Sequence, residues 1–180
     1  MRAVLDANVL VPILSCDLLL TAARYELFQP IWSPSILGEV TRNIIEINPD
    51  LDPDRLGARI AAMSKSFPSA SLSGWEPVPS VVNEKDQHVL SVALAAEADV
   101  VVTEDAQLRR QLRADGRIGA QRLDEFLVSQ ATDDAEGWAL VVVAMARRRR
   151  NPPVDPPVLL ASIERGPSDT RRCGGDVSLG

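Results

Sequence analysis

The chain carries four acids, Asp6, Glu39, Asp86 and Asp105, whose positions indicate one site. Asp6 directly follows an apolar segment suited to a short buried strand, and α/β proteins bind ligands outside the carboxyl ends of such strands. Carboxylates that crowd together repel one another by about 1–4 kcal/mol per pair at ~4 Å. A hard divalent cation, Mg²⁺ or Mn²⁺, removes that penalty. On a phosphodiester such an ion can generate hydroxide and stabilise the leaving oxygen.

Alternating strand-like and helical segments must position these acids. Short strands are predicted around Val4 and Leu5, at Pro30–Trp32 and at Val100–Val102. Ile118 is expected in a last edge strand. The valine triplet is expected at the centre of the sheet. This alternation predicts an α/β fold with a parallel sheet and right-handed crossovers. Three of the four acids then lie near strand-to-helix turns on one edge of the sheet, and Glu39 can reach back towards it.

The predicted helices follow from apolar spacing and from capping residues. Residues 69–82, rich in Ser, Gly and Pro, leave room for a loop and one short edge strand. The helices are expected at Ser15–Phe28 with Ser15 as cap, after Ser33-Pro34, after Asp52-Pro53, at Glu84–Glu97 with Asn83 as cap, after a Thr103 cap to Leu112, at Asp124–Val128, at Trp138–Arg150 and at Val158–Arg165.

The domain organisation follows from length and composition. With 180 residues, 46% of them hydrophobic, the chain can build one well-packed domain and an appendage. Residues 1–130 are expected to form that domain. Residues 131–165 are expected to form a helical extension with a proline-rich linker, and residues 166–180 have the composition of a disordered tail.

Each acid also has an ordinary structural explanation. Asn83-x-x-Asp86 matches a variant of the capping box, so Asp86 could serve only its helix. Asp105 falls in a first helical turn, where a carboxylate gains about 0.3–1 kcal/mol from the helix dipole. Glu39 alone would be a solvated helix residue. Asp6 has no such alternative, and the four acids together are a stronger signal than any one of them.

Charge and cysteine content narrow the function classes. The net charge of −6 argues against a surface built for duplex nucleic acid, although residues 141–180 carry a net +3. Cys16 and Cys173 are too few for a disulfide framework or a zinc site. No signal peptide and no membrane-spanning segment is expected, so the expectation is a soluble, cytoplasmic protein.

Taken together, four segments resemble PIN-domain ribonucleases and, within them, the larger VapC-type toxins of bacterial toxin–antitoxin pairs. The likeness runs from residue 1 to about residue 128 and continues more weakly through Arg147–Val158. Each motif is loose alone, whereas their order and spacing are specific. The segments are Leu5-Asp6-Ala7-Asn8-Val9-Leu10, Trp32-Ser33-Pro34-x-Ile36-Leu37-x-Glu39-Val40, Asp86-x-His88-Val89-Leu90-x-x-Ala93 and Val102-Thr103-x-Asp105.

The resemblance implies a three-layer α/β/α domain in which acids hold Mg²⁺ or Mn²⁺ and water cleaves RNA. Asp6, Asp86 and Asp105 would be metal ligands, and Glu39 would bind the ion through water or orient the nucleophile. Asn8 and Thr103 would hold the acids in place. Proteins of this kind usually form homodimers and are silenced by a cognate antitoxin that fills the acidic groove.

The chain departs from that pattern beside Asp86. Where relatives commonly read Asp-Pro-Asp-Asp-x-His, it has Asn83-Glu84-Lys85-Asp86-Gln87-His88, which places a cation next to the expected ligand. Two rival functions therefore stay open: a catalytically inactive PIN-like protein that binds RNA or a partner, and a structure-specific DNA nuclease. A phosphatase of the haloacid dehalogenase type would want a second aspartate where this chain has Asn8.

Two further features have competing interpretations. The basic run Arg147, Arg148, Arg149 and Arg150 could contact RNA phosphates, or it could complement a helix dipole and solvent. His88, the single histidine, is expected to point away from Asp86 and to act in a structural or supporting role, since a metal-bound hydroxide makes a histidine base unnecessary.

Overall fold

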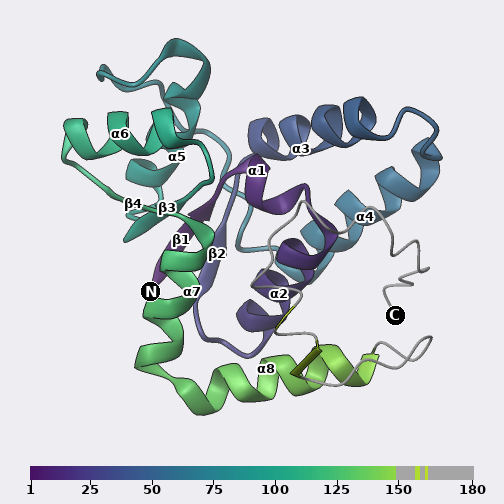
Figure 1. Ribbon diagram of the computed structural model, residues 1–180. Helices are drawn as coiled ribbons and strands as arrows, with labels where there is room; N and C mark the ends of the chain where they lie inside the picture. Colours follow the sequence, from purple (N-terminus) through teal and green to yellow (C-terminus); the bar gives the residue numbers. More distant parts are fainter. Residues whose placement is uncertain (149–156, 159–160, 162–180) are drawn as a thin grey trace.

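A computed structural model describes residues 1–148, 157–158 and 161 (Figure 1). The chain alternates short strands with helices, as predicted. In order, the elements are β1 Arg2–Leu5, α1 Ala7–Leu10, α2 Ile13–Arg24, β2 Gln29–Ile31, α3 Pro34–Ile47, α4 Pro53–Ser66, the 3₁₀ helix η1 Glu84–Asp86, α5 Gln87–Ala95, β3 Val100–Val102, α6 Ala106–Asp115, β4 Gly119–Gln121, α7 Leu123–Asp133 and α8 Ala135–Arg148.

The four strands form one parallel sheet in the order β2-β1-β3-β4, which confirms the predicted parallel sheet. The Val100–Val102 triplet is an interior strand and is buried along its whole length. Strands buried on both faces favour such continuous β-branched runs. The edge strand expected within residues 69–82 is reduced to a single bridge between Trp32 and Ser71, so that prediction was wrong.

Helices cover both faces of the sheet. The connection from β1 to β2 passes through α2, and the connection from β2 back across β1 to β3 passes through α3, α4 and α5. Right-handed crossovers that step in opposite directions cover opposite faces. The helix α2 contacts β2, while α5 contacts β1 and β3 (Figure 1). The expected three-layer α/β/α architecture is therefore confirmed.

Aliphatic side chains dominate the core, and a few aromatic pairs join its parts. Phe28, just before β2, meets Phe126 of α7 edge to face, with ring centroids 5.1 Å apart. Trp32 is fully buried and meets Phe67 in the same geometry at 6.0 Å. Edge-to-face pairs at these distances are attractive because a ring edge is positive and a ring face is negative. They tie α7 and the end of α4 to the sheet.

Of the predicted capping residues, Ser33 is confirmed and three others are wrong. Ser33 caps α3 through Ile36 N–H, as predicted. The second helix instead begins at Ile13, after Pro12, and ends at Arg24; Ser15 lies inside it and donates to the Val9 and Pro12 carbonyl oxygens. The predicted Ser15 cap and the extension to Phe28 were therefore wrong. The short helix α1 was not predicted.

The two other wrong caps lie next to the acids. Asn83 precedes η1, but its side chain makes no capping hydrogen bond. The helix after β3 is capped by Asp105, not by Thr103: Asp105 Oδ1 accepts from the Gln107 and Leu108 N–H groups at 2.7 and 3.0 Å. The Thr103 hydroxyl is occupied by a different partner, which is described below.

The helix α8 packs along α2 on the side away from β1 (Figure 1). Arg148 Nη2 reaches Asp17 Oδ1 at 2.8 Å and Thr21 Oγ1 at 2.6 Å.

The predicted domain boundary at residue 130 falls inside α7, and the division into domains stays a prediction. Of the predicted helix at residues 158–165, the structure describes two residues, 158 and 161, both helical, as is Pro157 before them; the predicted tail lies outside the described residues. No helix in the described part of the chain is long and apolar enough to span a membrane.

The packing of α8 predicts that it is part of the folded unit. Met145 is fully buried, whereas Leu140 on the same helix is 56% exposed. We expect Met145→Ala to lower the free energy of unfolding by about 2–5 kcal/mol, because it leaves a cavity. Leu140→Ala should change it by less than about 0.5 kcal/mol. Urea denaturation followed by circular dichroism measures both; equal effects would mean that α8 does not pack as described.

Candidate metal centre

Asp6 is the most buried of the four acids, with 6% of its surface exposed. It stands between β1 and α1 and caps that helix, so the expectation that Asp6 has no capping role was wrong. Its Oδ1 accepts from the Ala7 N–H at 2.7 Å, and its Oδ2 accepts from Asn8 Nδ2 at 2.7 Å and from the Thr103 hydroxyl at 2.6 Å. A buried carboxylate needs such donors, because burial without hydrogen bonds strongly disfavours the charge.

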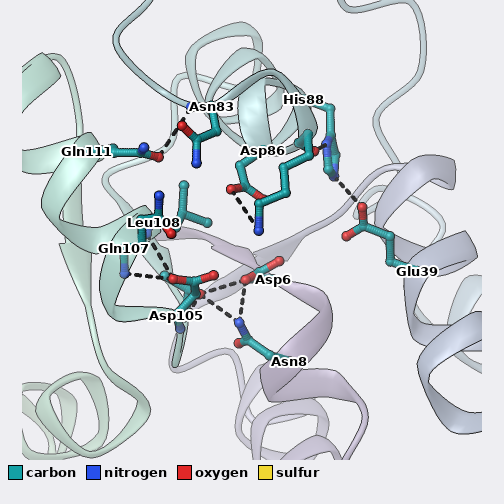
Figure 2. Close-up of polar contacts among 12 residues, drawn as sticks. Asp6, Asn8, Glu39, Asn83, Asp86, His88, Asp105, Gln107, Leu108 and Gln111 are labelled. Carbon is teal, nitrogen blue, oxygen red and sulfur yellow. Dashed lines mark hydrogen bonds and ion pairs between the residues drawn. The ribbon is translucent and has the colours of Figure 1, made fainter. Parts of the chain in front are cut away.

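Asn8 and Thr103 join the ends of β1 and β3. Asn8 Nδ2 also donates to Thr103 Oγ1 at 2.9 Å, and its Oδ1 accepts from the Glu104 N–H at 2.9 Å. The Thr103 hydroxyl in turn accepts from the Asp105 N–H at 3.1 Å. The two side chains thus fix Asp6 and the turn that carries Asp105 in one network (Figure 2).

Asp105 divides its two oxygens between structure and the site. Its Oδ1 caps α6, while its Oδ2 takes part in no hydrogen bond among the described residues. Arg109, one turn further along α6, donates to the Thr103 carbonyl oxygen at 2.7 Å. That contact ties the turn between β3 and α6 to the side chain of Arg109.

Asp86 ends η1 and faces Asp6 and Asp105 across the carboxyl edge of the sheet (Figure 2). Its Oδ2 is buried and has no hydrogen-bond partner. The ammonium of Lys85 lies 3.5 Å from that oxygen, close enough for an ion pair. The side chain of Lys85 is 66% exposed and that of Asp86 only 17%. Asp86 caps no helix with its side chain, so the capping explanation does not account for it.

Glu39 approaches from α3 and pairs with His88. His88 Nε2 lies 3.5 Å from Glu39 Oε1, and Arg42 Nη2 lies 3.8 Å from the same oxygen. The other ring nitrogen of His88 lies 2.9 Å from the Lys85 carbonyl oxygen. Sequence reasoning missed the His88–Glu39 contact, because it joins two helices that are distant in the chain.

His88 faces an acceptor on each side of its ring. A carbonyl oxygen and a carboxylate can both only accept. His88 Nε2 is buried and makes no hydrogen bond, and its 3.5 Å contact with Glu39 is an ion pair when the ring is protonated. Burial lowers the pKa of His88, but its contact with the Glu39 carboxylate and with the Lys85 carbonyl outweighs this, and the pKa is raised above its usual value. When it is protonated, the ring offsets part of the negative charge of Glu39.

The charges of the acids act on one another. Burial raises the pKa of Asp6 above its usual value; hydrogen bonds from Thr103 and Ala7 oppose this, and the charges of Glu39 and Asp86 add to it. Burial also raises the pKa of Asp86, which Lys85 opposes and the charges of Asp105 and Glu39 reinforce. Asp6 and Asp86 are therefore each close enough to other acids of the set for their charges to raise its pKa.

The donor set suits a hard divalent cation, because carboxylate oxygens are the ligands such ions prefer and Asp86 Oδ2 is buried without a hydrogen bond. The side chains are not yet arranged around one position. Among the described residues, no group of three or more His, Cys, Asp and Glu side chains is placed to hold an ion. Both Asp6 oxygens are hydrogen-bonded, and a positive charge from Lys85 already lies against Asp86.

The described part of the predicted basic run, Arg147 and Arg148, lies apart from this site. Arg147 and Arg148 end α8, which lies at the opposite end of the molecule from the acids in Figure 1, and Arg148 is engaged with Asp17. Arg149 and Arg150 lie outside the described residues. An RNA contact by these arginines stays a prediction.

The fold and the site together define a class of protein: a parallel α/β/α domain with acids that face one another at the carboxyl edge of its sheet. A family model described as PIN domain matches residues 2–107, which is more than half of the chain. The chain belongs to the PIN domain family. No curated protein matches, and no solved structure matches.

Family membership indicates a nuclease. PIN domains are generally nucleases that bind nucleic acid and typically use divalent metal ions, and the matched residues include all four acids together with Asn8 and Thr103.

The raised pKa of Asp86 predicts a pH-dependent stability without divalent metal. A carboxyl whose folded pKa is raised contributes stability below its unfolded pKa, about 3.9, and loses it as the pH rises through the folded pKa. In EDTA, Asp86→Asn should therefore unfold at a higher temperature than the wild type near neutral pH, and the difference should shrink towards about pH 4.

Thermal unfolding followed by circular dichroism across that pH range measures the difference. The matched control is Asp50→Asn, which removes an exposed acid from the turn between α3 and α4. A variant Asp86→Asn that is less stable than the wild type at neutral pH would contradict the unfavourable charge at this position.

Proposed function

We propose that the chain is a metal-dependent endoribonuclease toxin of a type II toxin–antitoxin pair. The observation that carries the proposal is the convergence of Asp6, Asp86 and Asp105 at the carboxyl edge of a PIN domain, where burial and mutual repulsion raise the pKa of Asp6 and Asp86. Carboxylates placed at such a disadvantage are stabilised by a bound cation.

The side chains would divide the work as follows. Asp86 and Asp105 each offer an oxygen free of hydrogen bonds within the described residues, and together with Asp6 they would hold Mg²⁺ or Mn²⁺. When bound, the ion supplies an activated water and stabilises the leaving oxygen of a phosphodiester. Glu39, steadied by His88, would orient the attacking water.

Thr103 and Asn8 position rather than react. Their hydrogen bonds hold the Asp6 carboxylate in one orientation at the end of β1. A side chain held in this way does not have to be ordered when substrate binds, which favours catalysis through positioning.

The proposed partners are RNA, a second copy of the chain and a cognate antitoxin, in the cytoplasm. Exposed apolar side chains on α3 support a protein partner: Ile45 is 50% and Ile47 73% exposed. The acids repel one another at this edge of the sheet, so the part of an antitoxin that enters the site would carry a positive charge.

The first test is cleavage of RNA by the purified protein with Mn²⁺. Asp6→Asn should lower the rate by at least about a hundredfold, because it removes a charged ligand. Glu39→Gln should also lower it, whereas Glu46→Gln, an exposed acid seven residues further along α3, should leave it unchanged. Circular dichroism confirms that each variant is folded, and a DNA substrate of the same sequence should stay intact.

The outcomes separate the rival functions. Unchanged cleavage by a folded Asp6→Asn variant would refute the site assignment. Equal cleavage of DNA would favour the DNA nuclease. No saturable Mn²⁺ binding in calorimetry, together with no cleavage, would favour the inactive binding protein.

The toxin role predicts a phenotype. Induced expression of the wild-type chain in bacteria should slow growth, and Asp6→Asn should remove the effect at equal protein level, because growth arrest would depend on RNA cleavage. Colony counts after induction and immunoblotting measure both. Equal growth inhibition by the two proteins would mean that the toxicity, if any, is not enzymatic.

A further inference from the structure

The ammonium of Lys85 stands where the acids most need a positive charge. It lies 3.5 Å from Asp86 Oδ2, a buried oxygen with no hydrogen bond. Asp105 and Glu39 add negative charge around Asp86. Among the described residues, no other cation contacts Asp86. The pair is therefore more than a solvated surface contact, for which little effect would be expected.

The backbone of Lys85 is fixed while its side chain can leave. The Lys85 carbonyl is held by His88 Nδ1 at 2.9 Å, and the His88 ring is steadied by Glu39 and lies 6.4 Å, between centroids, from Trp75. The Lys85 side chain itself is 66% exposed and has a flexible four-carbon stem. It can swing into solvent without disturbing η1 or α5.

A divalent ion and this ammonium cannot both bind Asp86 Oδ2, the buried oxygen that lies next to Lys85. An ion bound by the carboxylate would lie about 2.0–2.1 Å from an oxygen, and an ammonium in contact with the same group would repel it across a few ångströms. Binding of the ion thus requires that the ammonium move away.

We infer that Lys85 is a built-in counter-ion of Asp86 that a divalent cation must displace, so that metal binding to this chain is a competition with its own side chain. The inference rests on the metal site of the proposed function. Lys85 is a positioning and regulatory residue, and it is not assigned a contact with substrate. Its charge stabilises the folded protein without metal, and it lowers the affinity of the folded protein for metal.

The test measures Mn²⁺ binding to the purified full chain by isothermal titration calorimetry. Lys85→Met keeps the length of the side chain and removes the charge, and should lower the dissociation constant by about tenfold. Lys85→Arg keeps the charge and should stay within about twofold of the wild type. Arg110→Gln removes one exposed charge from α6 without touching an acid, and should also stay within about twofold.

A second readout needs no metal. In EDTA, Lys85→Met should unfold at a lower temperature than both the wild type and Arg110→Gln, because Asp86 has lost its counter-ion. This effect opposes the tighter Mn²⁺ binding of the same variant, and a merely structural role of Lys85 would not produce the two in opposite directions.

The results that overturn the inference are specific. Binding that is unchanged or weaker in Lys85→Met, an equal gain in Arg110→Gln, or no saturable Mn²⁺ binding in either the wild type or Lys85→Met would each refute it. RNA cleavage by the wild type is scored separately. A chain that binds Mn²⁺ in competition with Lys85 but cuts no RNA would refute the proposed function and leave the inference standing, whereas cleavage with unchanged binding in Lys85→Met would do the reverse.

Discussion

Burial of the Asp6 carboxylate is the constraint on which the site and its surroundings depend. An ionised group that is 6% exposed is strongly destabilised unless donors surround it. The chain supplies three: the Ala7 N–H, the Asn8 amide and the Thr103 hydroxyl. Because Thr103 belongs to the far side of the β1–β3 pair, the same hydrogen bonds that tolerate the charge also tie the two strand ends together.

These hydrogen bonds offset only part of the cost of burying the charge. Desolvation and the neighbouring carboxylates still raise the pKa of Asp6 and of Asp86, so the metal-free edge is under electrostatic strain. Two basic side chains from one short segment oppose it: Lys85 faces Asp86, and His88, when protonated, faces Glu39. Under the proposed function, a bound divalent cation would remove the rest of this repulsion.

The sequence alone predicted the parallel sheet, the valine strand and the helix opened by Ser33-Pro34, because each rests on local pattern. It failed where a polar side chain had a choice of partner. Thr103 is also a residue type that caps helices, but its hydroxyl donates to Asp6 across the sheet, and Asp105 caps α6 instead. The contact between His88 and Glu39 was equally inaccessible, since it joins residues 49 positions apart in the chain.

What brings the acids together is the register of the strands, and apolar packing sets that register. Leu5 pairs with Val102, and the Asp6 N–H donates to the Val102 carbonyl oxygen at 3.1 Å, so Asp6 and Thr103 follow side by side. A slip of one residue would turn the buried side chains of β1 and β3 to the opposite faces of the sheet. It would also separate Thr103 from Asp6. The buried aliphatic residues of the two strands therefore determine the geometry of the acidic edge.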